Sequence, residues 1–180
     1  MGSDVSPACF VAALERQLLC SNYRAGSSTG AGSVHVGSCD VHGRDGSIEL
    51  RSLQHGVIIP TDPLTGKVTG SRQHCSFNFT KEIDSSSPYL FKAVATGQTL
   101  KSAEFNFYRI NYSGQEEIYY IITLENVRVV HYSPVMHDMR SVTGTGHMED
   151  ISLSYEKITH LYKDGNILHS DSWNEKYGCH

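Results

Sequence analysis

Apolar and polar residues alternate with a period of two in several stretches of this chain. Segment 103–108 places Phe105 and Phe107 between polar neighbours, and segments 77–80 and 151–155 repeat the pattern. Because successive side chains of a β-strand point to opposite faces, each stretch is typical of a strand with one face on a core and the other in water. The pattern therefore predicts a mainly β protein.

One longer stretch, 118–130, is almost continuously apolar and rich in β-branched residues. This composition favours a strand that is buried on both faces. The stretch is longer than a typical strand of about five or six residues. We therefore expect a bend or a bulge near Glu125 and Asn126.

Turn residues connect the predicted strands over short distances. Asp164-Gly165 lies between two apolar segments, and this dipeptide favours a two-residue hairpin turn with positive φ at both positions. The sequence 111–114, Asn-Tyr-Ser-Gly, separates a strand that ends at Ile110 from one that begins near Glu116. Consecutive strands that are joined so tightly must be antiparallel.

A short helix is predicted at about 87–96. Ser87 suits the N-cap position, Pro88 the first helical position, and Gly97 the left-handed position after the C-terminus. Leu90 and Ala93 fall on one face of this helix. A single capped helix among many strands is expected to cover an open end of a barrel.

Two stretches lack the pattern of a core element. Segment 23–33 is rich in Gly and Ser and is typical of a flexible loop. Segment 56–73 begins with a short apolar run and continues with turn residues. A connection of this length is uncommon unless it is functional or disordered. Two interpretations stay open: an extended arm that docks on a neighbouring molecule, or a mobile surface loop.

Composition and charge narrow the function. The chain has 180 residues, which suits one domain over 1–180, and its formal net charge is -4. The fifteen Lys and Arg residues are scattered, whereas nucleic-acid binding needs a clustered basic surface. No apolar run approaches the roughly 18 residues of a membrane span, and the start of the chain lacks the basic region of a signal peptide. We expect synthesis and folding in the cytosol, without insertion in a membrane.

Metal binding and disulfide formation are not expected. The odd cysteine count and the absence of a C-x-x-C pair argue against a disulfide framework and a zinc site, so reduced thiols are predicted at Cys9, Cys20, Cys39, Cys75 and Cys179. His131, His137 and His147 cluster loosely in the sequence, but no H-E-x-x-H motif is present. The histidines are interpreted as solvated or hydrogen-bonded residues.

No catalytic residue or cofactor is predicted either. His169, Ser170 and Asp171 are consecutive, and neighbours in one strand cannot form a catalytic relay because they point to alternate faces. The adjacent Glu116 and Glu117 meet the same objection, and a G-x-S-x-G motif is absent. The sequence gives no ground for regarding the chain as an enzyme.

Several long motifs, in order, carry a resemblance to a known family. They are Pro60-Thr61-Asp62-Pro63 with Thr65-Gly66-Lys67, and then 79–94, 96–105, 108–111, 114–116, 124–127, 155–159, 164–167 and 169–173. Together they cover roughly 46–173, and they resemble the Hcp family, the haemolysin-coregulated tube proteins of type VI secretion systems.

The resemblance implies a fold and an assembly. The fold would be an antiparallel β-barrel of two packed sheets with one short helix and an extended loop at 56–73. Such proteins form hexameric rings that stack into the inner tube of the secretion machine, and they leave the cell without a cleaved signal peptide. The partners would be further copies of the chain, the sheath, the spike protein and small effector proteins carried in the lumen.

The resemblance also points to residues for ring stacking. A partly open barrel exposes strand edges, and identical neighbours could cover them in a closed ring. The loop would then reach the next ring, with its stacking residues at Pro60, Thr61, Asp62, Pro63, Thr65, Gly66, Lys67 and Gly70.

The chain departs from the family in a divergent N-terminal segment at about 9–45 and in a divergent turn at 141–146. Two other classes of function therefore stay open. The chain could act as free rings that carry effectors. It could also be an extended relative that is itself a secreted effector or enzyme through its N-terminal segment.

Overall fold

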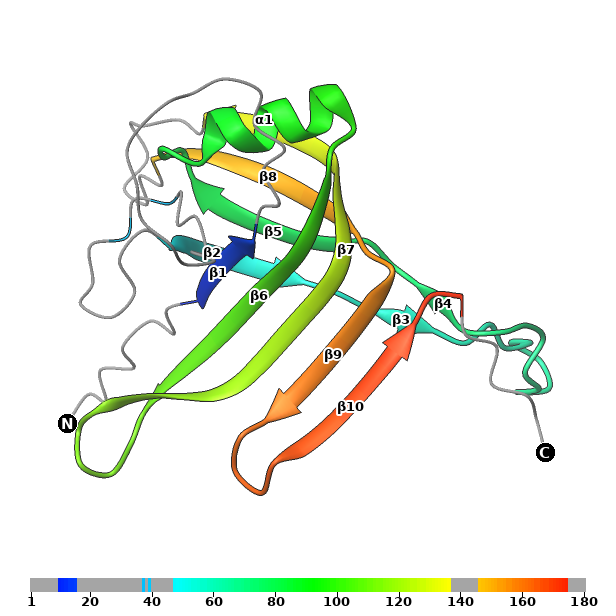
Figure 1. The fold of residues 1–180 in the computed structure, drawn as a ribbon. Helices are drawn as coiled ribbons and strands as arrows, with labels where there is room; N and C mark the ends of the chain where they lie inside the picture. The colour runs from blue at the N-terminus through cyan, green and yellow to red at the C-terminus, as the bar shows by residue number, and fades with distance from the viewer. Residues whose placement is uncertain (1–9, 16–36, 38, 40–46, 137–145, 175–180) are drawn as a thin grey trace.

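Ten strands and one helix make up the part of the chain that the computed structural model describes, namely residues 10–15, 37, 39, 47–136 and 146–174. Eight strands form one sheet in the order β10-β9-β7-β6-β1-β2-β5-β8, in which every pairing is antiparallel. A further pairing of β7 with β8 closes six of them into a barrel (Figure 1). The barrel strands are β1 (Phe10–Glu15), β2 (Ile48–Gln54), β5 (Phe77–Glu82), β6 (Thr99–Ile110), β7 (Glu116–Met136) and β8 (His147–Ser154). The mainly β, antiparallel barrel with one helix is confirmed.

The long strand β7 links the barrel to the remaining strands. One edge of β7 pairs with β6 from Glu116 to Arg128. The other edge pairs with β9 (Lys157–Tyr162) from Tyr120 to Glu125 and with β8 from Arg128 onward. Between these parts Asn126 has a φ of 52°, so the strand leaves regular geometry where the sequence predicted a bend. A register shift between Val129 and His131 adds a bulge.

Strands β9 and β10 (Ile167–Ser172) form a hairpin that extends from the barrel wall. The sequence predicted a two-residue turn at Asp164-Gly165. The turn instead has four residues, 163–166, because Tyr162 pairs with Ile167. Positive φ falls at Gly165 and Asn166, one residue later than expected, and the amide of Asn166 donates to the carbonyl of Lys163.

The predicted helix is α1 (Ser87–Thr96), which packs against β7 over one end of the barrel (Figure 1). It begins with Ser87, and Ser86 occupies the N-cap position without a side-chain cap. Ser87 was expected to be the N-cap, but its hydroxyl instead accepts a hydrogen bond from the amide of Asp84. At the other end Gly97 has a φ of 63°, as predicted.

The core lies inside the barrel and beneath α1. Phe77 and Phe105 are fully buried with ring centroids 4.4 Å apart, and Leu124 and Leu153 are buried beside them in the same cluster. Burying one such side chain contributes about 1.5–3 kcal/mol relative to leaving it exposed. These are the inward positions of the alternating segments from which the strands were predicted.

Strand β1 was not predicted. It lies between β2 and β6 in the sheet, whereas the sequence analysis treated the apolar run there only as too short for a membrane span. It belongs to the N-terminal segment 9–45, most of which lies outside the described residues. The Gly/Ser-rich segment 23–33, His137 and residues 141–145 lie outside them as well.

Candidate functional site

The segment 56–73, here called the arm, is a β-hairpin that projects from the barrel (Figure 1). Strand β3 (Val57–Ile58) and strand β4 (Gln73–His74), which ends one residue beyond the arm, form a separate two-stranded sheet. Further out, Thr61 pairs with Val68, and the amide of Thr69 donates to the carbonyl of Pro60 over 2.9 Å. The structure shows this segment as a hairpin, and its docking on a neighbouring molecule stays a prediction.

The tip of the arm is closed by its own side chains. The carboxylate of Asp62 accepts hydrogen bonds from the amide of Leu64 at 3.0 Å and from the hydroxyl of Thr65 at 2.6 Å. The Thr65 bond, followed by the Leu64 bond, lowers the pKa of Asp62. The amide of Gly66 donates to the carbonyl of Asp62, and its φ of 69° suits glycine. The turn is therefore shaped locally.

The arm exposes most of its apolar side chains to solvent. Leu64 at the tip is 93% exposed and Val68 is 66% exposed. Val57, Ile58 and Ile59 near the base are also exposed. Several exposed apolar side chains on one projecting element are a candidate site of protein interaction. The predicted stacking residues Pro60, Thr61, Asp62, Pro63, Thr65, Gly66, Lys67 and Gly70 form the hairpin that presents these side chains.

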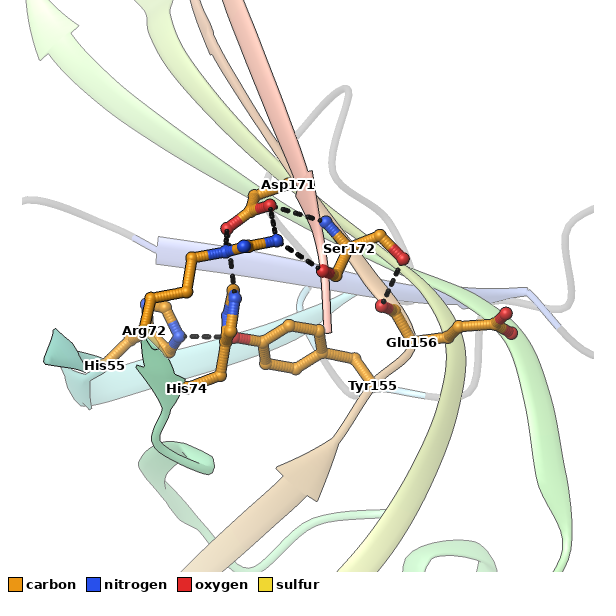
Figure 2. A network of polar contacts seen from close by, with 7 residues as sticks. All are labelled: His55, Arg72, His74, Tyr155, Glu156, Asp171 and Ser172. Atoms are coloured by element: carbon orange, nitrogen blue, oxygen red, sulfur yellow. Dashed lines mark hydrogen bonds and ion pairs between the residues drawn. The ribbon is translucent and has the colours of Figure 1, made fainter. Parts of the chain in front are cut away.

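At the base of the arm, polar contacts join it to the body of the protein (Figure 2). Both Nε and Nη2 of Arg72 donate to the carboxylate of Asp171 in β10, each over 2.5 Å. Nη2 also donates to the carbonyl of Ser172 over 2.9 Å. This is a bidentate ion pair, in which both partners are mostly shielded from solvent.

Two histidines and a tyrosine complete these contacts. Nε2 of the buried His74 lies 3.1 Å from Asp171, and its Nδ1 lies 2.9 Å from the hydroxyl of Tyr155. The same hydroxyl lies 2.6 Å from Nε2 of His55, at the end of β2. Arg72, His74, Asp171, Tyr155 and His55 are here called the anchor network.

The donors and acceptors of the anchor network can all be satisfied with neutral histidines. If Nε2 of His74 donates to Asp171, its Nδ1 accepts the hydroxyl proton of Tyr155. The oxygen of Tyr155 then accepts from Nε2 of His55. The chain of hydrogen bonds ends on the Asp171 carboxylate, whose charge Arg72 balances.

Electrostatics at the network follow from burial and charge. Burial raises the pKa of Asp171, but the hydrogen bonds and charge of Arg72 outweigh it, so the pKa lies below its usual value. Burial and then the Asp171 charge raise the pKa of Tyr155. Burial lowers the pKa of His55, and the neighbouring His160 and His74 lower it further. The network is therefore built for an ionised Asp171 and a neutral His55.

The network includes a Tyr-His-Asp series that could be mistaken for catalytic machinery. Tyr155 is only 4% exposed, and His74 is covered by the ring of Trp173 at a centroid distance of 5.4 Å. Both side chains are therefore largely shielded from solvent. An open groove of about 530 Å³ borders Tyr155 and Trp173. Polar side chains that line it bond to one another: the amide of Asn126 donates to the carboxylate of Glu156 over 2.6 Å.

A second exposed surface lies on the edge strand β10. Within the described part of the chain β10 pairs only with β9, so its other edge presents unpaired backbone groups. Ile167 is 65% exposed and Leu168 is 60% exposed on this strand. An uncovered apolar edge is a ready template for pairing with another chain.

The other sequence candidates do not gather into a site. Among the described residues no group of three or more His, Cys, Asp or Glu side chains is placed to hold a metal. Cys39 and Cys75 are free thiols, and the other three cysteines lie outside the described residues. Glu117 pairs with Arg109 at 2.8 Å. In the described ranges, no helix is long and apolar enough to cross a membrane.

Sequence analysis missed the anchor network. Asp171 was considered only as a hydrolase candidate, and Arg72 and His74 were not singled out. Arg72 and Asp171 are 99 residues apart, and no local pattern pairs them. The available signal was indirect: a charged residue and two histidines border a turn-rich arm that lacks a core pattern of its own.

Comparison with known proteins gives consistent matches. The family profile described as "Type VI secretion system effector, Hcp" matches residues 27–162. The Major exported protein of Pseudomonas aeruginosa is 33% identical over 140 residues, which are 77% of this chain and 81% of that protein. The Hcp1 structure from Escherichia coli EAEC 042 is 51% identical, with a TM-score of 0.76 over 92% of this chain and 98% of the other. A further Hcp crystal structure, 20% identical, shares the fold with a TM-score of 0.79 over 94% and 99% of the two chains.

Proposed function

Because this chain belongs to the Hcp family of type VI secretion tube proteins, we propose that it forms hexameric rings that stack into the inner tube of that machine. In this proposal the function of the chain is self-assembly, in which identical copies bury one another's exposed surfaces. The tube is exported, and the sheath, the spike protein and small effectors are its partners. The exported relative from Pseudomonas aeruginosa supports the step out of the cell.

The observation that carries the proposal is the ordered, apolar arm. A hairpin that holds Leu64 93% exposed at its tip gains nothing within the monomer from that placement. Transfer of a leucine side chain from water to a protein interface contributes about 1.5–3 kcal/mol when burial is complete. Docking of the arm on the next ring would bury its apolar side chains.

Ring closure would use a different surface. The free edge of β10, with Ile167 and Leu168, suits a contact with a neighbouring subunit in the same ring. A contact between two different surfaces of identical copies either closes into a ring or grows without limit. The two surfaces would therefore separate two steps, ring formation through β10 and stacking through the arm.

An enzymatic role has less support. The buried Tyr-His-Asp series is shielded by Trp173, and the open groove beside it lacks a convergent pair of catalytic groups. Hydrolase and nuclease assays on the purified protein are expected to show no activity. Co-purification of a small toxin with rings, and with no tubes, would favour the carrier function instead.

Deletion of residues 60–70 tests the proposal. We expect the variant to form rings of the same mass as the parent protein, measured by light scattering after size exclusion, and to form no tubes in electron micrographs. Normal tubes from this variant would exclude the arm from stacking. A parent protein that is monomeric at every concentration would exclude ring assembly altogether.

A further inference from the structure

The arm needs an external support to keep a fixed direction. A two-stranded hairpin is marginally stable in water by itself. Strands β3 and β4 form their own sheet, and no pairing joins that sheet to the barrel within the described residues. The orientation of the arm relative to the body therefore depends on contacts at its base.

The anchor network supplies those contacts to both strands of the arm. On the C-terminal side, Arg72 and His74 bind Asp171. On the N-terminal side, His55 follows β2 directly, two residues before β3, and shares the Tyr155 hydroxyl with His74. Figure 2 shows these side chains converging from the arm, the end of β2 and the end of β10.

We propose that the anchor network fixes the direction of the arm and so makes Arg72, His74 and Asp171 positioning residues for ring stacking. This inference rests on the proposed function. Arg72, His74 and Asp171 would not contact the next ring themselves, because they act through the arm.

Geometry explains why a fixed base matters. Leu64 lies eight residues before Arg72, which in an extended strand corresponds to up to about 25 Å at roughly 3.3 Å per residue. A tilt of about 10° at the base would move the tip by about 4 Å, as much as a whole contact distance between apolar atoms. An arm that is loose at its base would therefore lose its docking position.

The Arg72–Asp171 pair is suited to this role by its shielding. The side chains are 19% and 16% exposed, and both oxygens of the carboxylate are engaged. A comparable Arg-carboxylate pair, Arg51–Glu82, lies on the barrel surface at 2.6 Å with both side chains about half exposed. An exposed pair such as Arg51–Glu82 contributes little to stability, because solvent screens its charges. The chain thus contains a matched control.

The test compares Arg72→Gln with Glu82→Gln. Arg72 lies in the arm, outside the barrel, so its replacement leaves the core untouched. For Arg72→Gln we expect unchanged ring mass and a fall of about tenfold or more in sedimentable tubes, since several arms per ring multiply a small loss at each contact. Glu82→Gln should form tubes as the parent does. Asp171→Asn, which keeps the shape of the side chain, should repeat the result of Arg72→Gln.

A spectroscopic measurement separates positioning from general destabilisation. Trp173 is the only tryptophan of the chain and stacks on His74, so its emission reports the state of the network directly. In Arg72→Gln rings we expect a red-shifted emission and faster tryptic cleavage after Lys67, together with unchanged thermal unfolding of the barrel. Glu82→Gln should change neither signal.

Two results would overturn the inference. One is a shifted Trp173 emission and faster cleavage with normal tubes, which would show that stacking does not need a fixed base. The other is loss of tubes with unchanged emission and cleavage, which would give Arg72 a role other than positioning. Both differ from failure of the proposed function, which would appear as normal tubes after deletion of residues 60–70 or as a monomeric parent protein.

Discussion

At the scale of single residues, two histidines make the body of the protein sensitive to acid. Burial lowers the pKa of His160, and the nearby His169 lowers it further. The Nδ1 atom of His160 lies 2.7 Å from the hydroxyl of Tyr120. Burial likewise lowers the pKa of His55, ahead of the effects of His160 and His74. The folded protein therefore favours the neutral form of both rings.

This arrangement predicts a loss of stability on mild acidification. Below the ordinary histidine pKa of about 6.5, His55 and His160 bind protons in the unfolded chain but stay neutral in the folded protein. The free energy of unfolding should therefore begin to fall when the pH drops below about 6.5. It should stop falling once the pH is below the lowered pKa values of the two histidines in the folded protein. Urea unfolding at a series of pH values between about 7.5 and 5 measures this slope.

His160→Asn provides the comparison for that slope. The variant lacks one of the two groups, so its free energy of unfolding should depend less steeply on pH in the same window. An equal slope in the parent and in His160→Asn would contradict the assignment.

At the scale of elements, the buried Lys81 links two barrel strands and the first residue of α1. Lys81 in β5 and Glu149 in β8 are both fully buried, with Nζ 2.6 Å from Oε1. Lys81 also contacts Asp84 at 2.6 Å and donates to the hydroxyl of Ser87, the first helical residue. Tyr132 in β7 donates to Glu149, and burial followed by that carboxylate raises the pKa of Tyr132 to about 12.

Removal of the cation from this pair should be costly. Lys81→Met keeps the aliphatic length but leaves Glu149 buried without its counter-charge, and we expect a loss of about 3–5 kcal/mol in the free energy of unfolding. Lys157→Met, which breaks an exposed pair with Glu125, should cost about 0–1 kcal/mol. Urea denaturation of both variants checks the difference, and similar values for the two would contradict the buried pair.

Elements were predictable where local pattern determines them. Alternation of apolar and polar residues predicted β5, β6 and β8, because successive side chains of a strand point to opposite faces. Gly97 predicted the end of α1, because glycine favours the left-handed conformation found there. Strand β1 was missed because a short apolar run has no local feature that tells a strand from other buried structure. The bounds of α1 agree with the prediction, but its N-cap is Ser86 and not Ser87, whose hydroxyl bonds to Asp84 and Lys81 instead.

The candidate site was predicted only in part. The arm followed from its turn residues and from a resemblance that covers roughly 46–173. The anchor network could not follow, because Arg72 meets Asp171 across 99 residues and Tyr155 lies between two distant histidines only in the folded chain. Polar contacts of this kind depend on tertiary packing that a single sequence does not display.

At the scale of the whole molecule, the two exposed apolar surfaces lie on different elements and should control different assembly steps. Leu64 is at the tip of the arm, whereas Ile167 is on the edge strand β10. Neither side chain contributes to the core, so a polar replacement should change the stability of the monomer by less than about 0.5 kcal/mol. Any effect on assembly can then be assigned to the surface itself.

Leu64→Ser and Ile167→Lys should therefore fail at different stages. Leu64→Ser is expected to give rings without tubes, because the tip loses apolar area while β10 is intact. Ile167→Lys is expected to give monomers, because a charge on an edge strand opposes pairing with another chain. Light scattering after size exclusion and electron microscopy distinguish monomer, ring and tube. If Ile167→Lys still formed rings, closure would not use β10.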